Sequence, residues 1–152
     1  RLSKLLRSYA ADLLNAGISE KHSVEVEISS KAETAVIDCD ARLISRAIGN
    51  LVQNSINHNP QGCDIFLSLD CSSVNVSITV ADNGVGMSVE KLRELEEKPH
   101  YMESTDERLD LRHGLGLLLV RQIVEAHDGI MKIESMSQSG YKTILTFQRP
   151  RS

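Results

Sequence analysis

Residues 74–86 read VNVSITVADNGVG, an alternation of apolar and polar side chains that runs into an acidic residue and two glycines. The period of two predicts a half-buried strand, and a similar alternation in residues 63–70 predicts its antiparallel hairpin partner. Asp82 is in phase with every second residue from Val74 to Val80, so we expect it to point inward. An inward carboxylate needs a partner, such as a ligand amine. A plain Asp-Asn-Gly turn remains the alternative.

Helical spacing of apolar residues predicts three helices, and period-two stretches predict the strands. The helices are expected over residues 2–16, from a cap at Asp40 to before Pro60, and over 115–127; the strands over 24–28, 35–38, 63–70, 74–82, 130–136 and 141–148. This order predicts an α+β two-layer sandwich, in which a mixed, mostly antiparallel sheet carries helices on one face. We expect one domain over residues 1–152, with an N-terminal helix and linker in 1–22.

Composition excludes several classes of protein. The 152 residues are 41% hydrophobic and 25% charged, which is typical of a globular domain and not of a disordered chain. The net charge of −4 and the five aromatic residues disfavour nucleic-acid binding. Three cysteines without metal spacing indicate reduced thiols, and we expect Cys63 to be a core residue. No stretch is apolar enough to span a membrane, and the start at Arg1 suggests a piece of a longer protein.

Residues 50–60 read NLVQNSINHNP, and at 3.6 residues per turn Asn50, Asn54 and His58 stack along one line of the helix. Asparagine is a mediocre helix former, so several in one helix lower its intrinsic stability. A side-chain amide oxygen is a hard, neutral ligand that suits Mg²⁺, which also takes phosphate and water ligands. Spacing alone leaves open whether these side chains bind a ligand or only form the solvated helix face.

Residues 113–117 read HGLGL and stand immediately before the third predicted helix. Free amides at a helix start, with glycines that permit close approach, can bind an anion. The motif fits neither the mononucleotide nor the dinucleotide fingerprint, because it follows a charged stretch and not a strand. More than half of residues 90–112 are charged, so we expect a mobile lid between the two glycine motifs.

In this order, the three motifs resemble the ATP-binding catalytic domain of sensor histidine kinases, within the wider class of gyrase, heat-shock chaperone and mismatch-repair ATPases. Asn50–Pro60 resembles the asparagine box, Asp82–Gly86 the first glycine box and Gly114–Leu117 the second. The resemblance extends over residues 24–150 and is especially clear in residues 114–129, GLGLLLVRQIVEAHDG. It implies binding of ATP and Mg²⁺ and donation of the γ-phosphoryl group to a histidine.

The resemblance also implies residue roles. Asn54 would coordinate Mg²⁺ beside the phosphates, and Asp82 would accept a hydrogen bond from the adenine amino group. Gly84 and Gly86 would shape the adenine pocket, and the amides of Gly114–Leu117 would hold phosphates under a lid of residues 87–113. The implied nucleotide-binding set is Asn54, Asn57, His58, Asp82, Gly84, Val85, Gly86, Met87, Arg112, His113, Gly114, Leu115, Gly116 and Leu117, with Asn50 and Asn54 as the catalytic pair.

The chain departs from the family pattern in three places. Asn57 stands where many members carry Lys, which removes a phosphate contact. Arg112 and His113 precede the second glycine box where another glycine often lies, and a compensating role for either side chain is only a guess. The lid contains no Phe, so the phenylalanine box is missing, and Leu95, Tyr101 or Met102 could pack in its place.

Position 50 separates the branches of the wider class. In the hydrolysing members a Glu four residues before the Mg²⁺ ligand acts as general base, and here that residue is Asn50. An amide cannot take a proton, so we expect phosphoryl transfer to an imidazole that is already nucleophilic. Catalysis would then depend on positioning and electrostatics.

None of the five histidines stands in a sequence like the family's acceptor box; His127 closes a helix, and we expect His22 in a surface loop. The resemblance therefore implies an upstream dimerisation domain that carries the acceptor histidine, and a response regulator as partner. It also implies a monomeric, cytoplasmic fragment whose parent could be membrane-anchored. Two alternatives remain: a degenerate nucleotide-binding or interaction module without phosphoryl transfer, and an ATP-hydrolysing member of the wider class.

Overall fold

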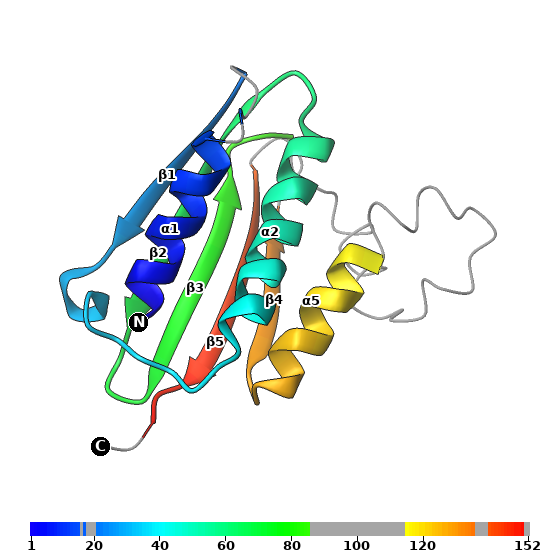
Figure 1. Ribbon diagram of the computed structural model, residues 1–152. Coiled ribbons are helices and arrows are strands. Elements are labelled where there is room, and N and C mark those ends of the chain that lie inside the picture. Colours follow the sequence, from blue (N-terminus) through cyan, green and yellow to red (C-terminus); the bar gives the residue numbers. More distant parts are fainter. Residues whose placement is uncertain (16, 18–20, 86–114, 136–139, 151–152) are drawn as a thin grey trace.

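A computed structural model describes residues 1–15, 17, 21–85, 115–135 and 140–150 (Figure 1). The elements in chain order are α1 (Leu2–Asn15), β1 (His22–Ile28), the 3₁₀ helix η1 (Ser30–Ala32), α2 (Ala41–His58), β2 (Cys63–Cys71), β3 (Asn75–Asp82), α5 (Leu115–Ala126), β4 (Ile130–Ser135) and β5 (Tyr141–Gln148). The expected lid over residues 87–113 lies outside the described residues. No helix in the described ranges has the length and apolar character needed to cross a membrane.

The five strands form one sheet in the order β1-β2-β3-β5-β4. β1 and β2 are parallel, because the chain crosses over through α2 between them, and the other neighbours are antiparallel. α1, α2 and α5 all cover the same face of the sheet (Figure 1). The predicted two-layer α+β fold with a mixed, mostly antiparallel sheet is confirmed.

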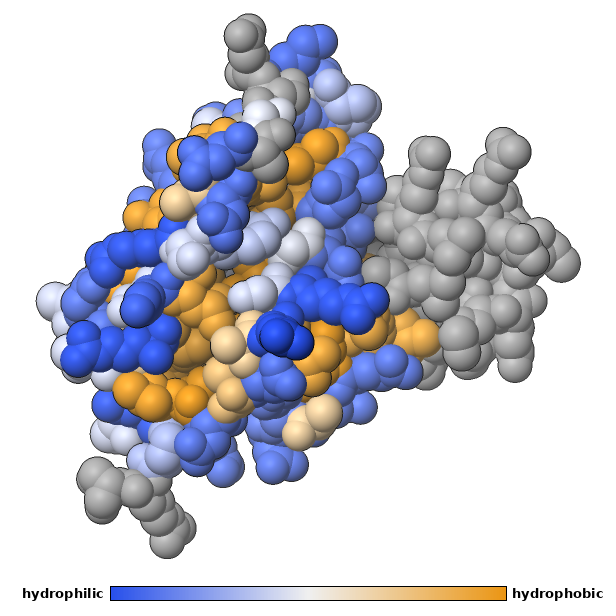
Figure 2. All heavy atoms as spheres, viewed as in Figure 1, coloured by the Kyte–Doolittle hydropathy of each residue, from blue (hydrophilic) through white to orange (hydrophobic). Residues whose placement is uncertain are grey.

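The core lies between the sheet and the helices. Alternate residues of β2 and β3 are buried, as the period of two predicts, and α2 presents a stripe at helical spacing to them. The largest fully buried side chains are Phe147, Leu2, Leu6, Ile44, Ile48, Leu51, Ile65, Leu67, Leu69, Ile78, Leu145 and Val52. Outside the core, the helix-covered side is mostly hydrophilic, with apolar areas between the helices (Figure 2).

Two strand predictions are wrong in detail. Residues 35–38 alternate between buried and exposed but pair with no strand in the described part of the chain. Ala35 and Ile37 are buried in the core from an extended connection. The alternation therefore reflects which side chains are buried, although the segment does not pair with a strand there. Val74 was expected to face inward, yet it precedes β3 and is 63% exposed.

The helix ends follow local chemistry. Asp40 caps α2 as predicted, with Oδ1 accepting hydrogen bonds from the N–H groups of Arg42 (3.0 Å) and Leu43 (3.3 Å). α5 ends near Asp128-Gly129 as predicted, but the left-handed residue is Asp128, with φ of 57°. Gly129 is required by space, because a Cβ there would lie 2.8 Å from the ring of Phe147.

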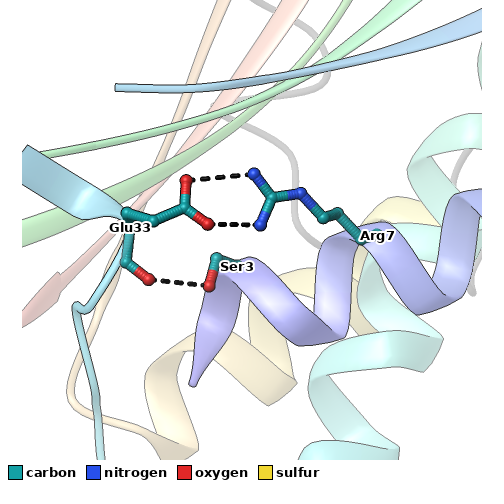
Figure 3. Close-up of polar contacts among 3 residues, drawn as sticks. All are labelled: Ser3, Arg7 and Glu33. Carbon is teal, nitrogen blue, oxygen red and sulfur yellow. Dashed lines mark hydrogen bonds and ion pairs between the residues drawn. The ribbon is translucent and has the colours of Figure 1, made fainter. Parts of the chain in front are cut away.

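α1 is anchored by its first turns to the segment after η1 (Figure 3). The Ser3 hydroxyl donates a 2.8 Å hydrogen bond to the carbonyl oxygen of Glu33. Arg7 pairs with both carboxylate oxygens of Glu33, and this contact raises the pKa of the guanidinium and lowers that of the carboxyl. α1 packs over β1 and β2, at one edge of the sheet.

Candidate functional site

The predicted site residues meet at one end of the molecule. Figure 1 shows the C-terminal ends of α2 and β3 on the same side, with the N-terminal end of α5 directed toward it. α2 packs beside α5 and over β3. Asn59, which caps the C-terminus of α2, accepts a hydrogen bond from the N–H of Val85, so this end of α2 lies beside the turn after Asp82. Motifs that lie about thirty residues apart in the chain are therefore brought together by the fold.

Asp82 is the last residue of β3 and is only 7% exposed, as its phase in the strand predicts. Its Oδ1 accepts a 2.9 Å hydrogen bond from the N–H of Gly84. Its backbone is tightly enclosed, since a Cβ on Gly140 would lie 2.3 Å from the carbonyl oxygen of Asp82. Gly140 also has a φ of 92°, so only glycine fits there without strain. The carboxylate is thus held at the sheet end by backbone contacts.

The residue after Asp82 extends the sheet by means of its side chain. Oδ1 of Asn83 accepts from the N–H of Asp64 at 2.8 Å, and its Nδ2 donates to Oδ2 of Asp64 at 2.9 Å. The other carboxylate oxygen of Asp64 accepts from the Ser23 hydroxyl at 2.7 Å. These hydrogen bonds hold the pKa of Asp64 below its usual value and fix the turn against β1 and β2.

The asparagines of α2 differ in their surroundings. Asn54 is 6% exposed, and its side-chain amide makes no hydrogen bond within the described part of the chain. Asn50 is half-buried, and its Nδ2 also lacks a partner among the described residues. Asn57 is exposed and accepts a hydrogen bond from Gln53. Asn57 fits the solvated-face interpretation. Asn54 is largely buried, yet its amide atoms keep some contact with solvent and make no hydrogen bond in the described ranges, so the amide is available to a ligand.

Asn59 and His22 were missed by the sequence reasoning. Asn59 is 1% exposed and joins α2 to the glycine turn through hydrogen bonds to Ser55 and Val85. His22 was expected in a surface loop, which is wrong: it starts β1, is 7% exposed, and its Nε2 lies 2.7 Å from the carbonyl oxygen of Asn59. The signal that could have found His22 is its phase, because it lies an even number of residues before the inward residues Val24 and Val26. The one clue for Asn59 is its place at the C-terminus of a helix, before Pro60.

Part of the predicted site lies outside the described residues: Gly86, Met87, Arg112, His113 and Gly114. α5 begins at Leu115, so the second glycine motif adjoins a helix start as expected. Leu117 is 4% exposed, and its side chain belongs to the core. Only its backbone is available to a ligand. His58 is half-buried on α2, and Val85 is 44% exposed beside the turn.

The donors at this end of the molecule fit a magnesium ion that is shared with a phosphate ligand. In the described ranges no three His, Cys, Asp or Glu side chains come together to hold a metal ion. The buried Asn54 amide has an oxygen free of hydrogen bonds within those ranges. Mg²⁺ is typically bound by one or two protein oxygens together with phosphates and water. Asn54 satisfies that requirement.

Residues 39–151 match the model of the family described as histidine kinase-, DNA gyrase B-, and HSP90-like ATPase. The chain belongs to this family. The sensor protein IrlS of Burkholderia pseudomallei (strain K96243) is 30% identical over 118 residues, which are 78% of this chain and 25% of IrlS. The chain therefore spans about a quarter of the length of that relative.

Two solved structures share the fold of this ATPase-family chain. The nucleotide-free catalytic domain of histidine kinase ThkA has a TM-score of 0.78 at 21% identity, covering 97% of this chain and 94% of that domain. The ATP-binding domain of PrrB from Mycobacterium tuberculosis has a TM-score of 0.75 at 22% identity, covering 99% of this chain and 95% of that domain. The resemblance expected from the three motifs is confirmed at the level of family and fold.

Proposed function

We propose that this chain is the ATP-binding catalytic domain of a sensor histidine kinase. The observation that carries the proposal is that the C-terminal end of α2, which carries the largely buried Asn54, lies against the turn after the largely buried Asp82, through the hydrogen bond between Asn59 and Val85. A carboxylate at a strand end can accept from the exocyclic amine of adenine, and an amide oxygen can bind the metal that accompanies the phosphates. The names of its relatives, the sensor protein IrlS and the histidine kinase ThkA, support the same assignment.

In this proposal, one set of residues contacts the adenine base of ATP and another set acts at its phosphates. Asp82 orients the adenine, and the turn at Gly84 allows the ring to lie close to the backbone. Asn54 would hold Mg²⁺, which offsets the charge that develops on the transferred phosphoryl group. Asn50 offers a neutral donor beside it and cannot act as a general base, so the chain positions ATP and leaves nucleophilic attack to a neutral imidazole.

The proposal includes partners outside this chain. The phosphoryl acceptor is a histidine on a dimerisation domain of the parent protein, and the phosphoryl group passes from it to a response regulator. The domain works in the cytoplasm as a monomeric unit of residues 1–152, with residues 87–113 closing over the nucleotide.

A calorimetric titration with a non-hydrolysable ATP analogue, with and without Mg²⁺, tests the base contact. Asp82→Asn should weaken binding at least about tenfold, or about 1.4 kcal/mol. Asp70→Asn is the matched control, because Asp70 is an exposed carboxylate on β2 near the opposite hairpin end. No binding by the wild type would contradict the proposal.

The metal role and the transfer are tested separately. Asn54→Ala should remove the gain in affinity that Mg²⁺ produces but keep the metal-free binding; Gln148→Ala, an exposed amide at the far end of the sheet, should keep both. Addition of the parent's acceptor domain should then yield phosphohistidine from labelled ATP. Binding without transfer to that domain would favour the degenerate module, and robust hydrolysis that requires Asn54 would favour the ATPase branch.

A further inference from the structure

Asn59 connects two of the motifs that form the site. It caps the C-terminus of α2, and its Nδ2 donates a 2.8 Å hydrogen bond to the carbonyl oxygen of Ser55, one turn earlier. Its Oδ1 accepts a 2.9 Å hydrogen bond from the N–H of Val85, in the turn after β3. The Asn59 side chain is thus hydrogen-bonded both to α2, the helix that carries Asn54, and to the turn that follows Asp82.

Asn59 also explains why residue 84 is glycine. Gly84 is absent from the residues with positive φ in the described chain, so its backbone conformation is open to any residue. A Cβ at this position, however, would lie 1.9 Å from Oδ1 of Asn59 and 2.3 Å from its Cγ. The glycine is required by the amide packed against it. The turn therefore approaches α2 closely enough for the Val85 hydrogen bond.

The far side of Asn59 is supported by β1. His22 is 7% exposed, and its Nε2 lies 2.7 Å from the carbonyl oxygen of Asn59. Because a carbonyl only accepts, Nε2 carries the proton and donates it. The same oxygen accepts a 2.9 Å hydrogen bond from the N–H of Gly62. Asn59 is therefore fixed in both backbone and side chain, and its amide has one available orientation.

We propose that Asn59 is a positioning residue for the base-binding end of the nucleotide site. It holds the Gly84-Val85 turn at a fixed distance from α2, and Oδ1 of Asp82 accepts from the N–H of Gly84 in that same turn. The amide of Asn59 thereby sets the direction of the Asp82 carboxylate relative to Asn54. This inference rests on the proposed nucleotide-binding function and adds to it a residue that touches neither base nor metal.

Two substitutions of Asn59 separate positioning from folding. Asn59→Ala removes the acceptor for Val85, whereas Asn59→Asp keeps an acceptor oxygen and loses the donor to Ser55. Both should lower the free energy of unfolding, since each leaves a buried polar group without its partner. In a ¹H–¹⁵N spectrum, Asn59→Ala should move the amide proton resonance of Val85 upfield, because its hydrogen bond is lost, whereas Asn59→Asp should keep it downfield.

The affinity for the non-hydrolysable ATP analogue should fall only in the variant that loses the Val85 hydrogen bond, and not in every variant with a lower free energy of unfolding. We expect Asn59→Ala to bind at least about tenfold more weakly and Asn59→Asp to stay within about threefold of the wild type. The loss of affinity in Asn59→Ala should be equal with and without Mg²⁺, because in this proposal Asn54, and not Asn59, binds the metal. Gln148→Ala serves as the control. Equal losses in the two variants, or none in Asn59→Ala, would overturn the inference.

A double-mutant cycle tests the contact with Gly84 directly. Gly84→Ala alone should destabilise the fold, since its methyl group overlaps the Asn59 amide. In the Asn59→Ala background that amide is absent, so the same change should have little further effect. Additive effects would show that Asn59 does not set the place of the turn.

Failure of the inference is distinct from failure of the proposed function. If the wild-type chain binds no nucleotide, the proposed function is wrong, and a positioning role for a nucleotide falls with it. If the wild type binds and the Asn59 variants bind equally well, only the positioning role is overturned. The Val85 resonance and the cycle with Gly84 need no ligand and can be read in either case.

Discussion

The backbone N–H of Asp40 donates a 3.0 Å hydrogen bond to Nε2 of His127, which joins the start of α2 to the end of α5. Nδ1 of the same ring lies 2.7 Å from the carbonyl oxygen of Ile123, so it carries the proton and donates to a free helix carbonyl. The ring also packs edge-on against Phe147 at a centroid distance of 6.5 Å. One side chain therefore fixes both helices that flank the proposed site.

Replacement of His127 by Phe should test this link, because it keeps an aromatic ring against Phe147 and removes both hydrogen bonds. We expect the free energy of unfolding to fall by about 1 kcal/mol, mainly because the part-buried carbonyl of Ile123 loses its donor, whereas water can replace the ring at the exposed N–H of Asp40. Urea denaturation followed by circular dichroism measures the change. Glu125→Ala, at an exposed position of α5, is the control and should be nearly neutral. Equal stability of His127→Phe and wild type would refute the link.

Replacement by Ala should have opposite effects on the free energy of unfolding at Gly49 and at Gly129. A Cβ on Gly49, inside α2, would make ordinary contacts of 3.6 Å with the ring of Tyr9. Gly49→Ala should therefore raise the free energy of unfolding by up to about 1 kcal/mol, through helix propensity and the less flexible unfolded chain. A Cβ on Gly129 would lie 2.8 Å from both the Phe147 ring and the carbonyl oxygen of Thr146.

Gly129→Ala should accordingly lower the free energy of unfolding by about 1–3 kcal/mol, because neither the ring nor the backbone has room to move in a packed core. Thermal melts of the two variants and the wild type, in one buffer, give the comparison. A stabilised Gly129→Ala, or a destabilised Gly49→Ala, would show that these contacts are not as close as described.

The fold was predictable where periodicity carried the information. The period-two stretches placed β2 and β3, and the apolar stripe and Asp40 cap placed α2, because burial on one face leaves a regular pattern in the sequence. Residues 35–38 show the limit of that rule. Their alternation is real, but a strand also needs a neighbour, and pairing depends on distant parts of the chain.

The site was predictable only as a set of motifs. Asp82 could be placed inward by its phase in the strand. Helical spacing put Asn54 in line with Asn50 and His58 but left open whether that line binds a ligand or is solvated. Asn59 could not be placed, because it follows the last residue of a helix, where the pattern gives no burial signal. His22 is in phase with the inward face of β1, but the strand was expected to begin two residues later, at Val24. Gly84 was expected for its flexibility, and the structure gives another reason: the amide of Asn59 occupies the place of a side chain.

Cys63 offers a chemical test of the packing beneath the site. It is 8% exposed, and burial, with the negative charges of Asp82 and Asp64, raises the pKa of its thiol to about 11. At about pH 8 only about one thiol in a thousand is then ionised. We expect alkylation by iodoacetamide to be far slower in the folded protein than in urea, as measured by peptide mass spectrometry. Asp82→Asn should speed the folded-state reaction, because one repelling charge is removed; an unchanged rate would contradict the Asp82–Cys63 interaction.

The lowered pKa of Asp64 predicts that the free energy of unfolding depends on pH. Hydrogen bonds from the Ser23 hydroxyl and the Asn83 amide hold the pKa of Asp64 below its usual value of 3.8, so the folded state favours the ionised form. A lowered folded-state pKa contributes stability that is present above the unfolded-state pKa and is lost as the pH falls through the folded-state value. Ser23→Ala removes the larger of the two contacts. The variant should therefore be less stable than the wild type at about pH 7, and the gap should narrow below about pH 4.

Urea denaturation of both proteins at several pH values measures that gap, and groups common to both, such as Asp70 with its bond from Ser29, cancel in the difference. Ser73→Ala is the matched control, because Ser73 is exposed in the hairpin turn and should give a small gap that does not vary with pH. A gap between wild type and Ser23→Ala that stays constant down to about pH 2.5 would mean that the hydroxyl does not favour the ionised carboxylate. Asn83 would still be held beside Asp82 by its two side-chain hydrogen bonds to Asp64, one with the N–H at 2.8 Å and one with Oδ2 at 2.9 Å.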